Sequence, residues 1–336
     1  MSEVSEENEK LSESADSKVM DSTSILGHLL EEPKLQEIKG NYELRGIIGR
    51  GGYAEIWVAK DLQNKRTVAV KSLREDKVED QQARNAFLQE ARLMLYLQHP
   101  GIVPVYDFFK DSGGRLHIIM KLVLGRTLDD LLNQIHDEYK GMAPREMESR
   151  ERTQMHERLE MFLKVCDMVA YAHEKRILHR DLKPANIMLG KQDDVYVMDW
   201  GIAEPHESSE PLQAPEDTMG TVCYLAPEIM RRKKYDERSD VYSLGLVLFD
   251  LTYLHPAFVQ MNEKLTCYYA VRGKTSHRKH EYGYRVPNWL RQVIDHAIYP
   301  DPDKRTPSVA AMMEQIREGM AGEASLLGRL KRLIGL

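Results

Sequence analysis

The stretch HRDLKPAN at 179–186, followed by DWG at 199–201, decides the fold and the chemistry of this chain. In the first stretch, Asp181 can accept a proton from a hydroxyl group, and Lys183 can neutralise a phosphate oxygen. Asn186 and the aspartate that opens DWG offer the hard oxygen ligands that Mg²⁺ prefers. Four side chains with these properties in so short a span predict a phosphoryl-transfer site.

Composition restricts the chain to the class of soluble globular proteins. It has 336 residues, of which 42% are hydrophobic and 30% are charged, so it can bury a sizeable core. This length exceeds the usual size of a single core, and we expect one large domain with two lobes and flanking tails. The formal net charge of -6 gives no broad attraction to nucleic acid, which we exclude as a principal ligand.

The cysteines and the start of the sequence indicate an intracellular protein. Cys166, Cys223 and Cys267 are odd in number and widely spaced, which argues against a disulfide framework or a zinc site. No apolar stretch approaches the roughly 20 residues that a transmembrane segment needs. The acidic beginning lacks the basic and apolar regions of a secretory signal, so we expect a cytoplasmic protein.

The sequence divides into a tail, a two-lobed domain and a second tail. Residues 1–41 are acidic and rich in Ser and Glu, and we expect them to be largely disordered. The domain covers 42–317, with a small lobe at 42–123 and a large lobe at 124–317. The last segment, 318–336, is amphipathic and basic.

Short β-rich runs make up the small lobe, and helical patterns follow. The runs are 42–49, 55–60, 67–74, 103–109 and 115–121. Phe87 and Met94 belong to a helical pattern between the third and fourth runs. A period-3.6 apolar stripe at 159–173 indicates that the large lobe is mainly helical. The charged segment 133–158 is expected to form an exposed helical extension, to which we assign no function.

A glycine-rich turn, GRGGYA at 49–54, joins the first two β-rich runs. Small residues at such a turn let backbone N–H groups approach a phosphate closely. Taken alone, the turn fits an ordinary Gly-rich hairpin equally well.

Lys71 ends the apolar run VAVK, where an unpaired ammonium group would be costly to bury. Glu90 on the following helix is the candidate partner. The pair would orient Lys71 toward the α- and β-phosphates of a nucleotide. The alternative is a lysine that reaches the surface from an edge strand.

Together these motifs resemble the eukaryotic-like (Hanks-type) serine/threonine protein kinases of bacteria, over about 42–317. The resemblance also rests on APE at 226–228 and SDVYS at 239–243, which follow in the expected order. It implies an α+β, bilobal protein-kinase fold. The small lobe would be a five-stranded antiparallel sheet with one helix, and the larger lobe would be mainly helical.

The resemblance assigns a role to each polar residue of the site. It implies that Asp181 is the catalytic base, that Lys183 contacts the transferred phosphoryl group, and that Lys71 pairs with Glu90. Asn186 and Asp199 would hold Mg²⁺, with Mn²⁺ as an alternative. A lysine two positions after the catalytic aspartate favours Ser or Thr over Tyr as the acceptor.

The resemblance also implies a nucleotide site for ATP. Adenine would bond the backbone of Lys121 and Val123, so the identity of the side chains at Lys121 and Leu122 would matter little. The implied contact residues are Ile48, Gly49, Arg50, Gly51, Gly52, Tyr53, Ala54, Glu55, Ile56, Ala69, Lys71, Met120, Lys121, Val123 and Met188. Two residues depart from the family pattern, since Trp200 replaces a phenylalanine and Ala54 replaces the third glycine.

Further residues receive structural and regulatory roles by the same resemblance. Glu228 and Arg305 would form a buried ion pair, and Asp240 would brace the catalytic loop. Arg180 before the catalytic aspartate implies control by a phosphorylated activation segment. Thr218 is the first candidate site, and Thr221 is expected to contact the catalytic aspartate.

The leading functional hypothesis is an ATP- and Mg²⁺-dependent serine/threonine protein kinase that also phosphorylates its own activation segment. Its partners would be protein substrates and a transient homodimer for autophosphorylation in trans. The alternatives are a nucleotide-binding pseudokinase scaffold and a small-molecule phosphotransferase. The apolar and basic residues at 326–334 suggest docking of the last segment on the kinase or on a partner, ahead of peripheral contact with an anionic membrane.

Overall fold

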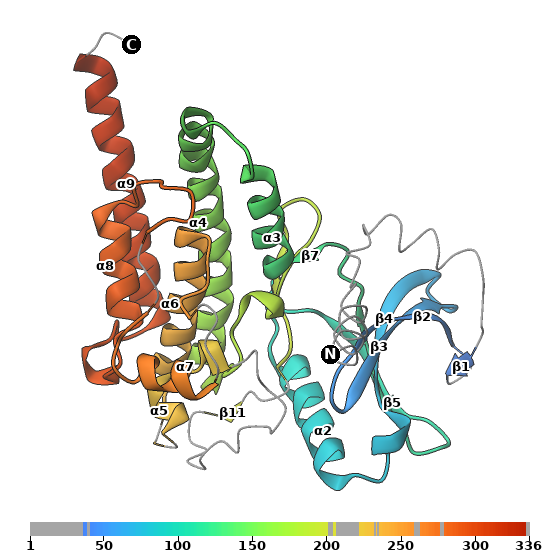
Figure 1. Ribbon diagram of the computed structural model, residues 1–336. Helices are drawn as coiled ribbons and strands as arrows, with labels where there is room; N and C mark the ends of the chain where they lie inside the picture. The colour runs from blue at the N-terminus through green and yellow to red at the C-terminus, as the bar shows by residue number, and fades with distance from the viewer. Residues whose placement is uncertain are drawn as a thin grey trace, which may run out of the picture.

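The computed structural model describes residues 36–38, 41–200, 204–205, 222–231, 233, 235–258, 263–275 and 279–333. A small lobe built on a β-sheet lies beside a larger helical lobe, and the chain passes from one to the other after β6 (Figure 1). This arrangement confirms the α+β, bilobal fold expected from the sequence.

The sheet of the small lobe is antiparallel and has the strand order β1-β2-β3-β4-β6-β5. Its central strand β4 buries apolar side chains on both faces, among them Val68, Ala69 and Val70. The strand bounds are Gln36–Ile38 (β1), Tyr42–Arg50 (β2), Ala54–Asp61 (β3), Arg66–Leu73 (β4), Val105–Lys110 (β5) and Leu116–Lys121 (β6).

All five expected strands are present, and β1 is an additional one. It lies in the tail that the sequence analysis expected to be largely disordered. Gln36 pairs with Leu44 and Ile38 pairs with Tyr42 through backbone hydrogen bonds. Three residues are too few to show a period-2 pattern, so the sequence gives no signal for this strand.

Helix α2 (Gln81–Tyr96) is the inserted helix of the small lobe, and it follows a 3₁₀ turn, η1 (Glu75–Lys77). Its first turn is fixed because the Asp80 carboxylate accepts hydrogen bonds from the N–H groups of Gln82 and Ala83. The helix buries Phe87 and Glu90 on the side that faces the sheet. A carboxylate is thereby delivered to the interior of the small lobe.

The large lobe is built around α6, whose residues are buried from Ser239 to Tyr253. Helices α4, α8 and α9 pack on it and on one another (Figure 1). The helix bounds are Leu128–Tyr139 (α3), Pro144–Glu174 (α4), Pro227–Met230 (α5), Glu237–Tyr253 (α6), Glu263–Ala270 (α7), Asn288–Ala297 (α8) and Val309–Leu333 (α9). The apolar stripe expected at 159–173 forms part of α4.

Short strands and 3₁₀ turns connect the helices of the large lobe. A three-stranded sheet has the order β10-β9-β7, and β11 pairs with β8. The bounds are Arg126–Thr127 (β7), Ile177–Leu178 (β8), Ile187–Leu189 (β9), Val195–Val197 (β10), Glu204–Pro205 (β11), Pro184–Asn186 (η2), Val222–Tyr224 (η3) and Pro302–Lys304 (η4). The HRDLKPAN stretch therefore lies between β8 and β9.

The segment 133–158 is mostly helical and most of its charged side chains are exposed, as the sequence suggested, but part of it is buried. It is divided between the end of α3 and the start of α4, and Glu151 within it is fully buried. Tyr139 donates a hydrogen bond of 2.7 Å to Glu151, and His280 lies 3.0 Å from the same carboxylate. Arg158 completes the group as an ion-pair partner. The buried charges of this group satisfy one another, which a count of charged residues cannot show.

Two further observations bear on the expectations from composition. Cys166, Cys223 and Cys267 are all described, and none of the three is in a disulfide bond. Among the described residues, no helix is both long enough and apolar enough to cross a lipid bilayer.

Two glycines of α9 provide a matched test of the packing between α8 and α9. A Cβ atom at Gly319 would overlap the Trp289 ring, whereas a Cβ atom at Gly322 would meet nothing within 4 Å. We expect Gly319→Ala to destabilise the protein by about 1–3 kcal/mol, because the indole ring must move. Gly322→Ala should stabilise it by about 0.5–1 kcal/mol, because alanine favours a helix interior. Urea denaturation of both variants measures the difference, and shifts of the same sign would contradict this packing.

Candidate active site

A cleft of about 420 Å³ lies where the two lobes face each other. The small lobe contributes its glycine-rich turn and Lys71, and the large lobe contributes Asp181, Asn186 and Asp199. Residues that are more than a hundred positions apart in the sequence thus line one cavity.

Lys71 and Glu90 form a close ion pair inside the small lobe. The Lys71 ammonium lies 2.6 Å and 2.7 Å from the two carboxylate oxygens of Glu90. It also lies 3.5 Å from an Asp199 oxygen, so the pair reaches the large-lobe side of the cleft. Burial alone would lower the pKa of Lys71, but the carboxylates of Glu90 and Asp199 raise it above its ordinary value. Lys71 therefore stays charged.

Tyr53, in the glycine-rich turn, joins this ion pair. Its hydroxyl donates a hydrogen bond of 3.1 Å to Glu90, and its ring centre lies 5.6 Å from the Lys71 ammonium. Burial and the neighbouring Glu90 raise the pKa of Tyr53, which keeps the hydroxyl protonated as a donor. The sequence placed Tyr53 beside the nucleotide but gave no signal for the bond to Glu90, because the two residues are 37 positions apart.

The catalytic loop holds three polar side chains against one another. The Lys183 ammonium lies 3.1 Å and 2.9 Å from the two Asp181 carboxylate oxygens. The Asn186 side-chain amide donates 2.8 Å hydrogen bonds to the Asp181 carbonyl and to its carboxylate. Because the nitrogen of this amide faces Asp181, its oxygen is left to accept a bond or to bind a cation.

Asp240 supports the backbone of this loop from below. Its carboxylate accepts hydrogen bonds from the N–H groups of His179 at 2.8 Å and Arg180 at 2.9 Å. His173 Nε2 lies 2.8 Å from the same carboxylate. Burial alone would raise the pKa of Asp240, but the His173 bond and the loop N–H group lower it. Arg180 has a φ of 70°, so this bond holds a strained conformation in place.

The aspartate of the DWG stretch, like Arg180, has a left-handed backbone conformation. Asp199 has a φ of 61°, and its side chain remains half exposed in the cleft. The next residue, Trp200, is buried, its ring lies 4.5 Å from the His179 ring, and its indole N–H donates to the Val197 carbonyl at 3.2 Å. The bulkier ring is thus accommodated with its polar atom satisfied, and Asp199 still faces the cleft.

The implied nucleotide residues separate into two groups in the structure. Those that line the cleft are Gly49, Arg50, Gly51, Gly52, Tyr53, Ala54, Ile56, Lys71, Met120 and Met188. The others lie outside its lining: Ile48, Glu55, Ala69, Lys121 and Val123. Glu55 turns away to an ion pair with Arg115, and Ile48 is 44% exposed.

The cleft also has lining residues that the sequence analysis did not assign to the nucleotide. They are Met94, Val103, Ala185, Val197, Met198 and Trp200, with Glu90 beside them. All six are apolar side chains, and they come from helix α2, a 3₁₀ turn, strand β10 and the connecting loops of both lobes. Their positions depend on how the lobes meet, which local sequence does not specify.

The donor atoms of the site fit a hard divalent cation. Asp199 offers a carboxylate, and Asn186 offers the amide oxygen that its hydrogen bonds to Asp181 leave open. Mg²⁺ is usually held by one or two carboxylates together with substrate phosphates. Among the described residues, no cluster of three or more His, Cys, Asp or Glu side chains could hold a metal ion by itself.

Glu228 and Arg305 form a bidentate ion pair in the large lobe, with distances of 2.8 Å and 2.9 Å. Both side chains are almost fully buried, and the Ser239 hydroxyl donates a further bond to Glu228 at 2.7 Å. The APE stretch is thereby fastened to the start of α6. Thr218 and Thr221, the implied regulatory residues, lie outside the described residues.

Comparison with protein families identifies the family of the chain. The chain matches the protein kinase domain over residues 42–316, and it belongs to the protein kinase family. The match covers the glycine-rich turn, the catalytic loop and the APE stretch.

Similar proteins are known from bacteria. The chain is 32% identical over 298 residues to the serine/threonine-protein kinase PknD of Chlamydia caviae, which covers 84% of this chain and 31% of PknD. It is 34% identical over 296 residues to the serine/threonine-protein kinase PknB of Mycolicibacterium smegmatis, covering 86% and 45%. It is 35% identical over 298 residues to the probable serine/threonine-protein kinase SCO3848 of Streptomyces coelicolor, covering 88% and 42%. The resemblance to bacterial Hanks-type kinases is confirmed, and the chain spans less than half the length of these relatives.

A buried carboxyl near the APE stretch gives the folded state a pH dependence. Burial raises the pKa of Asp250 to about 8, a hydrogen bond from Tyr224 acts against this rise, and Asp129 adds to it. The Tyr224 hydroxyl lies 2.5 Å from the Asp250 carboxylate. The folded protein keeps a proton that the unfolded chain releases at lower pH, so stability falls as the pH rises between the two pKa values.

Replacing Asp250 with Asn should remove this dependence, because the amide stays neutral. Between pH 6 and pH 8, we expect the free energy of unfolding of the wild type to fall by about 2 kcal/mol relative to Asp250→Asn. Urea denaturation of both proteins at several pH values measures the effect. Parallel pH profiles would contradict a neutral Asp250 in the folded state.

Proposed function

We propose that this chain is an ATP- and Mg²⁺-dependent serine/threonine protein kinase that transfers the γ-phosphoryl group of ATP to Ser or Thr hydroxyls of protein substrates. One observation carries the proposal. The Lys71–Glu90 pair is closed in the same cleft that holds Asp181, Asn186 and Asp199. We assign the catalytic domain to 42–317.

The reaction is an in-line displacement at the γ-phosphorus. The acceptor hydroxyl oxygen bonds to phosphorus, the bond from phosphorus to the bridging oxygen of ADP breaks, and the hydroxyl proton passes to the Asp181 carboxylate. Lys71 contacts the α- and β-phosphates, and Lys183 offsets negative charge on the transferring group. Holding the reactants in this order removes much of the entropic barrier.

Asn186 and Asp199 would hold the divalent metal, and Mn²⁺ could take the place of Mg²⁺ because it also prefers oxygen ligands. When bound, the cation supplies charge neutralisation at the phosphates. The hydrogen bond from the Asn186 amide to Asp181 orients Asn186, and the ion pair with Lys71 positions Asp199.

We further propose autophosphorylation in the activation segment, through a transient homodimer. Thr218 is the first candidate acceptor. The proposal is supported by Arg180, the cationic residue directly before the catalytic aspartate, whose N–H is fixed by Asp240. A phosphate in the activation segment would be paired by such a cation. Thr221 is expected to contact Asp181 and to help recognise the acceptor hydroxyl.

Two other functions fit a protein kinase fold less well. A pseudokinase scaffold would not need Lys71, Asp181, Asn186 and Asp199 together in one cleft. A small-molecule phosphotransferase would not need the APE stretch fastened to α6 through Glu228 and Arg305.

Replacing Asp181 with Ala tests the proposed mechanism. We expect kcat for phosphate transfer from radiolabelled ATP to a generic Ser/Thr protein substrate to fall by about 10²- to 10⁴-fold, because the general base is lost. Nucleotide binding, followed by calorimetry with Mg-ATP, should remain, because Asp181 is not among the proposed phosphate contacts.

Two outcomes would reject the proposal. Equal phosphate incorporation by wild type and Asp181→Ala would exclude Asp181 as the base. Wild-type protein that binds Mg-ATP but transfers no phosphate to protein would favour the pseudokinase. Mass spectrometry of the purified wild type then shows whether Thr218 carries phosphate.

A further inference from the structure

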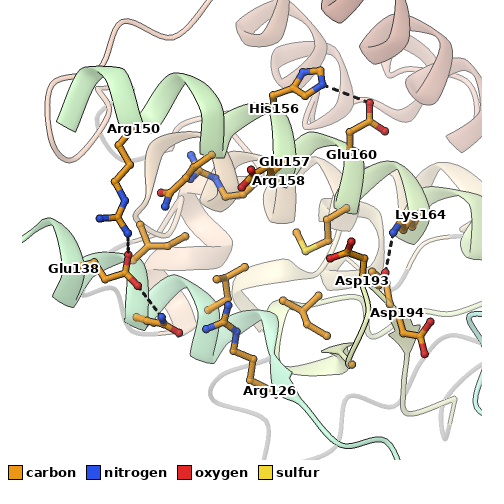
Figure 2. Close-up of a pocket in the computed structure, with 18 residues that line it drawn as sticks. Arg126, Glu138, Arg150, His156, Glu157, Arg158, Glu160, Lys164, Asp193 and Asp194 are labelled. Carbon is orange, nitrogen blue, oxygen red and sulfur yellow. Dashed lines mark hydrogen bonds and ion pairs between the residues drawn. The ribbon is translucent and has the colours of Figure 1, made fainter. Parts of the chain in front are cut away.

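A second groove, of about 540 Å³, lies on the large lobe and has no part in the proposed chemistry (Figure 2). It is formed by α3, the first half of α4 and the turn between β9 and β10. Its apolar lining consists of Leu131, Ile135, Met161, Leu189 and Val195. The groove is therefore suited to a segment that carries aliphatic side chains.

One end of this groove is rich in carboxylates. Glu157 and Glu160 come from α4, and Asp193 and Asp194 come from the β9–β10 turn (Figure 2). The Lys164 ammonium at this end donates to the Asp193 backbone carbonyl at 2.8 Å and to none of these carboxylates. Lys121 lies 3.9 Å from Asp194, and His156 lies 3.9 Å from Glu160. Within the described residues, Glu157 has no ion-pair partner.

The cations at the other end of the groove are mostly engaged. Arg150 pairs with Glu138, and Arg158 pairs with the buried Glu151. Neither guanidinium group therefore offsets the negative charge of the carboxylate end. A ligand with aliphatic side chains and two or three positive charges would complement the groove as a whole.

The last segment of this chain has that chemistry. Its sequence from 326 to 336 is LLGRLKRLIGL, in which apolar positions recur at helical spacing and the basic residues are Arg329, Lys331 and Arg332. Helix α9 continues through Leu333, so most of the segment has a helical backbone.

In the part of the chain that the structure describes, α9 lies on the other side of α4 from this groove. On α4, Glu157 and Met161 line the groove, whereas Arg152, Met155 and Leu159 line a hollow shared with α8 and α9. At about 100° per residue, these two sets lie on opposite faces of α4. Helix α4 therefore stands between α9 and the groove, and α9 runs on past the end of α8 (Figure 1).

We infer that the segment 326–336 of one copy docks in the α3–α4 groove of a second copy. Its leucines would cover the apolar lining, and its cations would lie among Glu157, Glu160 and the aspartates of the β9–β10 turn. Reciprocal docking closes a twofold dimer, because each copy offers both the segment and the groove. The charged segment 133–158 then has a role as one wall of the groove. This inference does not rest on the proposed function.

Charge reversal in the full-length protein tests the inference. The groove variant is Glu157→Lys with Glu160→Lys, and the tail variant is Arg329→Glu with Arg332→Glu. Both sites are helical, and both replacement side chains are good helix formers. Sedimentation velocity over about 1–100 µM measures the dimer dissociation constant, in the range where modest interfaces are populated.

We expect each variant to raise the dissociation constant by about tenfold or more, because like charges are brought together. The protein that combines both variants should associate nearly as well as the wild type, because the charges are complementary again. Glu75→Lys with Glu79→Lys, an equal charge change on exposed residues of the small lobe, should leave association unchanged.

Four results would overturn the inference. A wild type that stays monomeric throughout the range excludes the dimer. Unchanged association in the groove variant shows that the tail or another surface associates elsewhere. Unchanged association in the tail variant shows that the groove receives a different ligand. Loss in both variants without recovery in the combined protein shows that the two sites do not contact each other.

Discussion

The need to pair a buried ammonium group governs the organisation of the small lobe. Lys71 lies on a central strand, where its charge would be costly without a partner. The Glu90 carboxylate reaches the Lys71 ammonium only when α2 lies against the sheet. The ion pair therefore fixes the position of the helix relative to strand β4. Tyr53 extends the linkage to the glycine-rich turn through its bond to Glu90. A strand, a helix and a turn therefore respond together to whatever occupies the cleft.

The large lobe depends on a second buried anion. Asp240 is carried by α6, which is buried from Ser239 to Tyr253, and it binds two N–H groups of the catalytic loop. The left-handed conformation of Arg180 costs free energy that these bonds offset. Since Asp181 follows directly, the direction of its carboxylate is set by a residue about 60 positions later. The reacting groups are thus supported from the core, which keeps them in place while substrates exchange.

The sequence allowed the lobes, most strands and the polar residues of the cleft to be predicted, because each has a local pattern or a motif. Lys71 in an apolar run and Asp181 within HRDLKPAN are examples. What the sequence could not provide depends on distant contacts. The bond from Tyr53 to Glu90, the burial of Glu151 by Tyr139 and Arg158, and the pairing of β1 leave no periodic signal. The charged segment 133–158 is exposed over most of its length, as its charges suggest, but composition does not reveal that Glu151 and Arg158 within it face each other in the interior.

The tryptophan of the DWG stretch affects which shapes the cleft can adopt. Its indole fills a deep hollow beside His179 and satisfies its own N–H on Val197. Swinging this ring outward would leave a larger void than a phenyl ring leaves, and it would break a hydrogen bond that phenylalanine does not make. The outward state therefore costs more free energy than it would with phenylalanine at this position. Inhibitors that occupy the space of the Trp200 ring would lose affinity here, because the ring must first move outward. Compounds that bind with the ring in its inward position would be favoured.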